Sequence, residues 1–423
     1  MSAAALGVGG MMGAGLYTLL GLAAVSTGTL LPVAFLVAGV VAAFSVYSYS
    51  KLGATFPSRG GAASFLRQEF GTGVLSGGLN VFQYIAYLIA TALYAAGFAE
   101  YVRIVLGGDQ PTWLPKIIGA GVVVVFTAVN MVGTRLVGRA ETAIIAVESA
   151  ILLAFVGFAA GKADFGAVTA GPQGGTIGVL TGAALLYVTY QGFGVVTNTS
   201  GQMLRPSKQL PRAMFSALLV VAVVYLVIST LVVSLVPLPQ IEADAGHVLA
   251  DAGQAVWGNL GFLVISGAAI LATASAVNAT IFAASNIGYD VSENHQLSAA
   301  LTKTVWRSTP VALLVSGLVT VVIVLFFPLA AVGQMTSLAF LVVYGAVSLG
   351  HLRVRRQTGA VAWPLVAAVV FNAGLFVVLL VDAVRSGSPA TWITLVTALI
   401  GSFVFEAWYR RRPTGATGAA ASG

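Results

Sequence analysis

Charged residues are scarce in this chain of 423 residues. Asp, Glu, Lys and Arg together make up only 8% of it, whereas a soluble globular protein carries about 25%. This scarcity excludes a single water-soluble core. Cysteine is absent, which excludes disulfides and thiolate metal sites. The three histidines, His247, His295 and His351, fall in loops or at the ends of apolar runs. Their positions argue against a metal centre built from histidine, so no metal site and no cofactor is expected.

Apolar residues are abundant: 58% of the chain is hydrophobic and the mean hydropathy is +0.96. Apolar runs of 18 or more residues recur along the chain, and each could cross roughly 30 Å of hydrocarbon as a helix. The sequence therefore predicts an all-α polytopic membrane protein with twelve transmembrane helices. The expected ranges are 4–29, 32–54, 74–104, 117–133, 140–161, 177–203, 212–236, 258–289, 309–328, 330–351, 362–384 and 390–409.

Basic residues are distributed unevenly between the expected loops. If the N-terminus is cytoplasmic, only Arg103, Lys116, Lys162 and Arg385 of the 20 Lys and Arg residues fall at the outer ends. The inner loops hold the others, among them Arg59, Arg135, Arg307 and Arg412. This bias predicts that both termini are cytoplasmic, in a plasma (inner) membrane. The net charge of +7 is then a signal of orientation, and no nucleic acid partner is expected.

Glu148 is the one ionisable residue predicted to lie deep in the membrane. It follows Arg139 by nine residues on the fifth predicted helix, which is about 13 Å at 1.5 Å per residue. An ionised carboxylate is costly in hydrocarbon, so Glu148 should be protonated, paired or facing water.

Glycine is concentrated in the first predicted helix, at Gly7, Gly9, Gly10, Gly13 and Gly15. Each glycine weakens a helix by about 1 kcal/mol relative to Ala, so the chain could unwind around Gly13-Ala14-Gly15. The alternative is close packing of small residues between helices.

The sixth predicted helix has a hydrophobic half, a break at Gly192 and then a polar half from Thr197 to Gln202. Breaks in helices one and six, five spans apart, are typical of an inverted repeat of five helices around a central binding site.

Five segments together resemble the amino acid–polyamine–organocation (APC) superfamily. The run Gly9-Gly10-Met11-Met12-Gly13-Ala14-Gly15-Leu16-Tyr17 is similar to its G-x-I-I-G-[SA]-G-I-F signature. The other four similar segments are Thr55 to Gly61, Tyr190-Gln191-Gly192-Phe193, Arg205 to Ala213 and Ala274-Ser275-Ala276-Val277-Asn278.

The resemblance implies a LeuT-like 5+5 inverted repeat with discontinuous helices 1 and 6, and transport of amino acids or related amines. The α-carboxylate would meet backbone N–H groups at Gly13, Ala14 and Gly15. The α-amino group would meet carbonyls of Met11, Val188 and Gln191 beside Gly192. Phe193 or Tyr190 would close over the substrate, although both could equally be packing aromatics.

Two departures from the family pattern affect the expected substrate and coupling. Many members have an acidic residue directly after the Gly-Phe pair, where this chain has Gly194. A second positive charge on the substrate would lack its partner, so we expect neutral amino acids rather than arginine or polyamines.

The second departure is Glu148, which resembles a position where some members use a lysine amine in place of a sodium ion. We expect Glu148 to carry a coupling proton, or to ligate a cation such as Na⁺ beside Thr273 and Ser275. The alternative is a permanently neutral carboxyl hydrogen-bonded to backbone.

The sequence thus predicts a permease, not an enzyme, that works by alternating access as a monomer or homodimer. The expected domains are a first repeat (1–162), a second repeat (163–353), accessory helices (354–412) and a disordered cytoplasmic tail (413–423). Gln83, Tyr84, Tyr87 and Thr91 are expected to face inward on the third helix, and Asn278 and Asn286 to bridge helices. The alternatives are transport of amines or polyamines, of cationic amino acids or of inorganic cations on the same fold, an amino acid exchanger, a channel, and a carrier made of parallel halves.

Overall fold

The computed structural model describes residues 3–57, 61–107, 110–132, 137–170, 174–197, 199–306, 309–386 and 389–411. Within these residues the chain is almost wholly helical, and the single sheet is an antiparallel pair of short strands, β1 (Thr304–Trp306) and β2 (Thr309–Pro310). The expected disordered tail (413–423) lies outside the described residues, as do Arg59, Arg135, Arg307 and Arg412.

The elements of the N-terminal part are α1 (Ala3–Met12), α2 (Ala14–Thr27), α3 (Leu31–Thr55), α4 (Gly61–Phe70), α5 (Val74–Val105), α6 (Leu114–Val132), α7 (Val137–Ala159), α8 (Phe165–Ala170), α9 (Gly175–Leu186), the 3₁₀ helix η1 (Tyr187–Tyr190) and α10 (Phe193–Thr197). The elements that follow are η2 (Ser200–Gln202), α11 (Pro206–Leu235), α12 (Leu238–Ala243), α13 (Val248–Trp257), α14 (Asn259–Glu293), η3 (Ala299–Thr302), the two strands, α15 (Val311–Phe326), α16 (Leu329–Thr358), α17 (Ala362–Arg385) and α18 (Pro389–Arg410).

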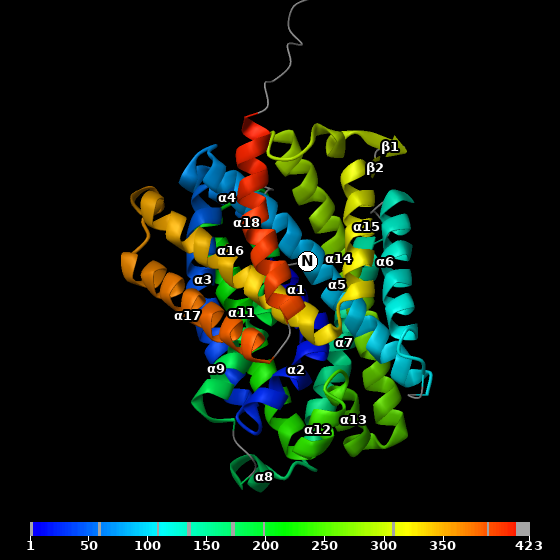
Figure 1. Ribbon diagram of the computed structural model, residues 1–423. Helices are drawn as coiled ribbons and strands as arrows, with labels where there is room; N and C mark the ends of the chain where they lie inside the picture. Colours follow the sequence, from blue (N-terminus) through cyan, green and yellow to red (C-terminus); the bar gives the residue numbers. More distant parts are fainter. Residues whose placement is uncertain are drawn as a thin grey trace, which may run out of the picture.

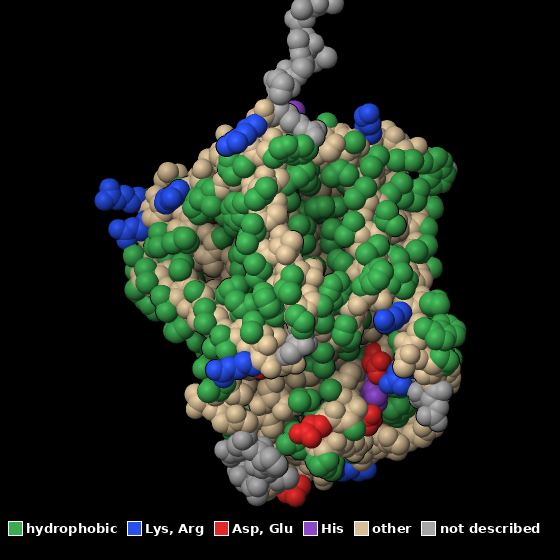
Figure 2. Space-filling model, viewed as in Figure 1, with side chains coloured by type: hydrophobic (Ala, Val, Ile, Leu, Met, Phe, Trp, Pro, Cys, Tyr) green, Lys and Arg blue, Asp and Glu red, His purple; other side chains and the backbone are tan. Residues whose placement is uncertain are grey.

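Many of the helices are long and apolar enough to cross a membrane. Among the described residues there are eight such helices, or nine if the bent pair α1 and α2 is one span. Three shorter apolar helices accompany them, at Ala143–Ala159, Gly175–Tyr190 and Val311–Phe326. Large apolar side chains such as Leu153, Leu219 and Leu318 are exposed on the outside of the bundle, and Figure 2 shows that hydrophobic side chains cover the middle of the visible face. The protein is therefore an all-α polytopic membrane protein.

The two ends of the bundle carry different elements (Figure 1). The short helices α8, α12 and α13 lie together at one end, here called the α13 end, whereas α4 and the β-hairpin lie at the other, here called the hairpin end. The broken pair α1 and α2 runs through the bundle between them. The first half, α1, packs against α10 and α11, and the second half, α2, packs against α9, α12 and α13.

Candidate functional site

The first helix break lies at Gly13. Helix α1 ends at Met12, α2 begins at Ala14, and the two halves are bent by 42°. Gly13 is the N-cap of α2 and makes no side-chain capping hydrogen bond. The first N–H groups of a helix have no intrahelical partner and carry its partial positive charge. The N–H groups of Ala14 and Gly15 are therefore suited to receive an anionic group.

The second break is a longer irregular segment. Helix α9 passes into the 3₁₀ turn η1, the chain turns at Gln191 and Gly192, and α10 begins at Phe193. The carbonyl of Val188 accepts a hydrogen bond from Gln191 N at 3.1 Å, and the carbonyl of Gln191 accepts one from Tyr344 Oη at 3.1 Å. The carbonyl of Gln191 also accepts a hydrogen bond from Gly194 N at 3.1 Å, so both of its lone pairs are engaged, whereas the carbonyl of Val188 retains a second lone pair for a ligand.

The two breaks cross in direct backbone contact. A Cβ added to Gly192 would lie 2.1 Å from the carbonyl carbon of Gly10, so only glycine permits this approach. Tyr225 of α11 links the two breaks, because its hydroxyl lies 2.5 Å from the carbonyl oxygen of Met11 and 3.3 Å from that of Thr189. The glycines therefore serve both roles considered from the sequence: Gly13 marks an interruption, and Gly10 and Gly192 allow close packing.

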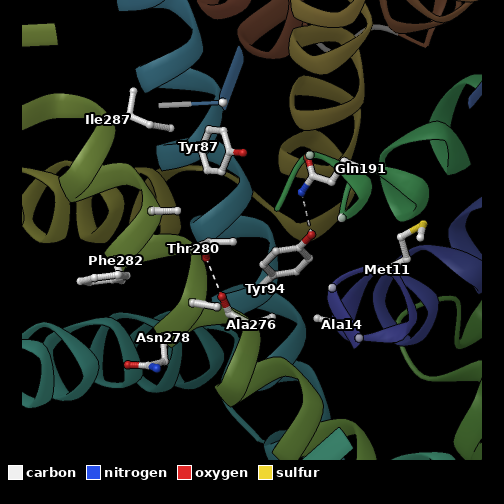
Figure 3. A pocket seen from close by; sticks show the side chains of 18 of the residues that line it. Met11, Ala14, Tyr87, Tyr94, Gln191, Ala276, Asn278, Thr280, Phe282 and Ile287 are labelled. Carbon is white, nitrogen blue, oxygen red and sulfur yellow. Dashed lines mark hydrogen bonds between the residues drawn. The ribbon is translucent and has the colours of Figure 1, made fainter. Parts of the chain in front are cut away.

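A cavity of about 990 Å³ lies where the breaks meet. It extends from Gly15 and Glu148 to Asp290 and Glu293, at the end of α14 on the hairpin side. Figure 3 shows Gln191 and Tyr94 pointing toward one another in this cavity, joined by a hydrogen bond of 2.9 Å from Gln191 Nε2 to Tyr94 Oη.

Eight of the predicted site residues line the cavity: Met11, Gly13, Ala14, Gly15, Glu148, Gln191, Gly192 and Ser275. The fold therefore brings together the two helix breaks, the fifth predicted span and the eighth. Gly194, the departure noted in the sequence, also lies in this lining.

The other four predicted residues do not belong to this lining. Tyr190 is fully buried and donates its hydroxyl to the carbonyl of Phe35, and Phe193 packs in a tilted arrangement against Tyr344 with ring centroids 4.9 Å apart. Thr273 donates to the carbonyl of Ala269 within its own helix. Val188 is buried in the turn η1.

Glu148 is 95% buried, with 5% of its surface exposed, and it lies on the cavity wall. Its atom Oε1 has no hydrogen-bond partner among the described residues, and neither has the hydroxyl of Tyr17. Tyr17 of α2 lies close enough to Glu148 for the two side chains to interact electrostatically. A carboxyl in this setting can take up a proton or a cation without disrupting an existing hydrogen bond at Oε1.

The polar stripe on α5 differs from the sequence prediction. Gln83 and Tyr87 line the cavity as expected, but Tyr84 does not: its hydroxyl lies 2.9 Å from Ser316 Oγ of α15, outside the lining. Thr91 instead donates to the carbonyl of Tyr87. The cavity face continues through Tyr94, which follows Tyr87 by two helical turns. That spacing was readable from the sequence and was missed.

Two further residues of the lining lacked a local signal. Tyr344 of α16 and Asn130 of α6 reach the cavity from helices whose patterns give no indication of it. Asn130 donates to Asn278 Oδ1 at 2.8 Å, which confirms that Asn278 bridges two helices.

All the charged side chains among the described residues that line the cavity are acidic. Glu148 lies at depth, and Asp290 and Glu293 lie near the hairpin end, with no Lys, Arg or His in the lining. Asp290 forms an ion pair of 2.8 Å with Arg67 of α4. The cavity can therefore accept a solute that carries its own positive group.

Comparison with known proteins identifies the kind of protein to which the chain is similar. The model of the family described as amino acid permease matches residues 1–405. The uncharacterized protein MJ0609 of Methanocaldococcus jannaschii is 31% identical over 97% of this chain and 94% of its own length. The inner membrane transport protein YbaT of Escherichia coli is 28% identical, covering 97% and 95%. The branched-chain amino acid permease BcaP of Lactococcus lactis is 25% identical, covering 96% and 93%.

Proposed function

Because the match over residues 1–405 makes this chain a member of the amino acid permease family of the APC superfamily, we propose that it is a secondary active transporter of amino acids rather than an enzyme. The observation that carries this proposal is the cavity at the meeting point of two broken helices. The N–H end of α2 lies on one wall, the carbonyls of the second break lie on another, and the described lining contains no basic side chain. Opposed half-helix ends suit the two charges of a zwitterion.

In this proposal the substrate carboxylate binds the N–H groups of Gly13, Ala14 and Gly15. The ammonium group binds carbonyl oxygens of Met11, Val188 and Gln191, next to Gly192. A carbonyl has two lone pairs, so those of Met11 and Val188, which each accept one hydrogen bond, leave room for a second donor. The carbonyl of Gln191 accepts two hydrogen bonds, so it would have to release Tyr344 Oη or Gly194 N to bind the ammonium group. Tyr190 and Phe193 would act as an aromatic gate only if they left their present packing during transport.

The topology we propose has twelve spans, made up of the nine that qualify when α1 and α2 count as one and the three shorter apolar helices. Helices one to five (1–162) and six to ten (163–353) would form LeuT-like inverted repeats, and 354–412 would be accessory. With both termini cytoplasmic in an inner membrane, the hairpin end faces the cytoplasm. The cavity then opens inward, as one state of alternating access by a monomer or homodimer.

The first experiment reconstitutes the purified protein in proteoliposomes and measures counterflow. Preloading with unlabelled alanine or leucine is expected to accelerate uptake of the labelled amino acid, because a carrier exchanges solute across the membrane. A channel gives no such acceleration. Uptake that is identical with and without preload would contradict the carrier assignment.

Substrate charge separates the two leading candidates. Gly194 in the cavity lining leaves the second break without a carboxylate, which favours neutral amino acids. The acidic lining of Glu148, Asp290 and Glu293 favours amines or cationic amino acids as the second candidate. We expect alanine and leucine to compete better than arginine or putrescine, and Gly194→Asp to shift the preference toward arginine. Stronger competition by arginine in the unmodified protein would support the second candidate.

Coupling is assigned in this proposal to Glu148, as a proton carrier or as a cation ligand with Ser275 and Thr273. Glu148→Gln should lower pH-driven accumulation at least tenfold, because an amide cannot load and release a proton, while counterflow persists. Glu293→Gln, which changes an exposed acidic residue of the same cavity, is the matched control and should retain the pH dependence. Full pH-driven accumulation by Glu148→Gln would eliminate the coupling role.

A further inference from the structure

A second group of ionisable side chains lies at the α13 end, away from the cavity. His247 is the N-cap of α13, Asp244 is the C-cap of α12, and Asp251 lies in the first turn of α13. Glu100 and Arg103 of α5 lie behind them and form an ion pair. None of these residues belongs to the cavity lining. Figure 2 shows acidic side chains and a histidine together near this end of the molecule.

His247 lies at the centre of the group and is 93% buried, with 7% of its surface exposed. Its two ring nitrogens face different carboxylates. Nδ1 is 3.3 Å from Glu100 Oε1, whereas Nε2 is 3.7 Å from Asp244 Oδ1 and 4.0 Å from Asp251 Oδ2. The spacing of four residues between His247 and Asp251 places both side chains on one face of the first turn of α13.

Asp251 supplies an independent indication of a missing partner. Only 7% of its surface is exposed, and Oδ2, the atom directed at His247, has no hydrogen-bond partner among the described residues. A buried carboxylate oxygen without a partner is costly. Asp244, in contrast, is partly exposed and leaves a route for an ion and a water molecule from outside.

Glu100 lies on the other side of the imidazole. Its carboxylate is fixed by Arg103 and lies 3.3 Å from Nδ1 of His247, which makes no hydrogen bond among the described residues. Gly246 allows this approach, since a Cβ there would lie 2.8 Å from Glu100 Cγ. Histidines that bind metals commonly direct one nitrogen to the metal and the other to a carboxylate, which fixes the tautomer and orientation of the ring. Glu100 has this position relative to His247.

We propose that Asp244, His247 and Asp251 form a binding site for a divalent transition-metal ion, with Zn²⁺ as the preferred species. The three ligand atoms lie within 4.8 Å of one another. Ligands of a tetrahedral zinc ion are about 3.4 Å apart, from bonds of about 2.1 Å, so a small rotation of the exposed Asp244 side chain completes the site. A water molecule takes the fourth position. One imidazole with two carboxylates favours Zn²⁺ over Ca²⁺ and Mg²⁺, which prefer oxygen ligands alone.

This site departs from the expectation of no metal centre. The histidine positions argue against a metal inside the membrane, and the site lies outside the spans, in the segment between α11 and α14. Residues 244–251 are near one another in sequence, but only the fold brings Glu100 against them. Metal binding here does not depend on the proposed transport activity, because neither break contributes a ligand.

The test measures Zn²⁺ binding to the full chain, purified in detergent with a tag that contains no histidine and stripped with a chelator. Isothermal titration calorimetry should show one saturable Zn²⁺ equivalent that a hundredfold excess of Mg²⁺ does not displace. His247→Gln and Asp251→Asn should each weaken binding at least tenfold. Glu100→Gln, a positioning change, should weaken binding by about tenfold without abolishing it.

Two matched controls each remove one histidine or one carboxylate outside the proposed site. His295→Gln removes an exposed histidine near the hairpin end, and Asp164→Asn removes an exposed carboxylate elsewhere. Both should bind Zn²⁺ as the unmodified protein does, and Zn²⁺ should raise the unfolding temperature of these controls but not of His247→Gln. Equal affinity in the unmodified protein and Asp251→Asn would overturn the proposal, and so would the absence of saturable binding. A transport-inactive protein that still bound one Zn²⁺ would contradict only the proposed function.

Discussion

The two ends of the molecule restrict access to the central cavity in different ways. At the α13 end backbone packs on backbone: a Cβ on Gly21 would lie 2.3 Å from the carbonyl oxygen of Ala245, and one on Gly178 would lie 2.2 Å from that of Ser26. At the hairpin end the cavity reaches the exposed side chain of Glu293, and the nearby contact is an ion pair between the side chains of Arg67 and Asp290. The α13 end is therefore held by close main-chain packing, whereas charged side chains make the contact at the hairpin end.

The largest effect on transport is expected at the α13 end, where Gly21 packs against the main chain of Ala245. Gly21→Ala places a methyl group against the carbonyl of Ala245 and Val248 Cγ2, so α2 and α13 cannot close as they do here. Transport should fall at least tenfold, measured as initial uptake in proteoliposomes.

The same change should also open the α13 end. The chain has no cysteine, so a single Val248→Cys, at a position buried here, reports access to a maleimide reagent. Its labelling should rise in the Gly21→Ala background. Gly267→Ala is the matched control, since nothing lies within 4 Å of its added Cβ. Unchanged labelling and uptake in Gly21→Ala would remove the distinction between the ends.

A smaller effect is expected from the charged side chains at the hairpin end. Arg67→Gln breaks an ion pair whose side chains are 20% and 31% exposed, and pairs of this kind contribute up to about 1 kcal/mol. Uptake should therefore change by no more than about fivefold.

The double variant sharpens this second test. Arg67→Gln combined with Asp290→Asn should show little change beyond either single variant, because both remove the same contact. Lys208→Gln, an exposed basic residue, should have no effect. A loss as large as that of Gly21→Ala would mean that the hairpin end also depends on close packing.

The smallest effect concerns Glu69 of α4, beside the same end. Both of its carboxyl oxygens are buried without a hydrogen-bond partner among the described residues, and burial raises the pKa of Glu69. The folded state therefore favours the neutral carboxyl of Glu69. This preference adds to the free energy of unfolding at low pH, and the contribution is lost as pH rises through the raised pKa.

Glu69→Gln should remove this dependence. Between about pH 5 and pH 8 the unfolding temperature of the unmodified protein should fall by a few degrees more than that of the variant, as measured by intrinsic fluorescence. Glu242→Gln changes an exposed carboxylate at the other end and should follow the unmodified protein. Parallel curves for Glu69→Gln and the unmodified protein would show that this carboxyl does not titrate with folding.

Local sequence patterns predicted the positions of the long helices and the break at Gly13. Apolar runs and glycine clusters act over a few residues, so they can be read directly. The partners that hold the breaks could not be predicted in this way: Tyr225 lies far along the chain from Met11, and Tyr344 reaches Gln191 from another helix.

The assignment of Tyr84 was wrong for a related reason. Periodicity placed Tyr84 on the cavity face, although its neighbour Gln83 lines the cavity and the hydroxyl of Tyr84 contacts Ser316. A helix position one residue away points about 100° around the axis. The helix was predicted correctly, but the cavity-facing line runs through Gln83, Tyr87 and Tyr94 instead of Tyr84, Tyr87 and Thr91. The difference becomes visible only when the neighbouring helices are in place.

The contact between Gly10 and Gly192 has a mechanical consequence. Two main chains that touch with no side chain between them can tilt against each other without rotamer changes at the point of contact. For such a tilt, the displacement of each main-chain atom increases with its distance from the contact. If α1 and α10 tilt by a few degrees about this contact, the crossing stays almost stationary and the displacement is largest at the far ends of the two segments.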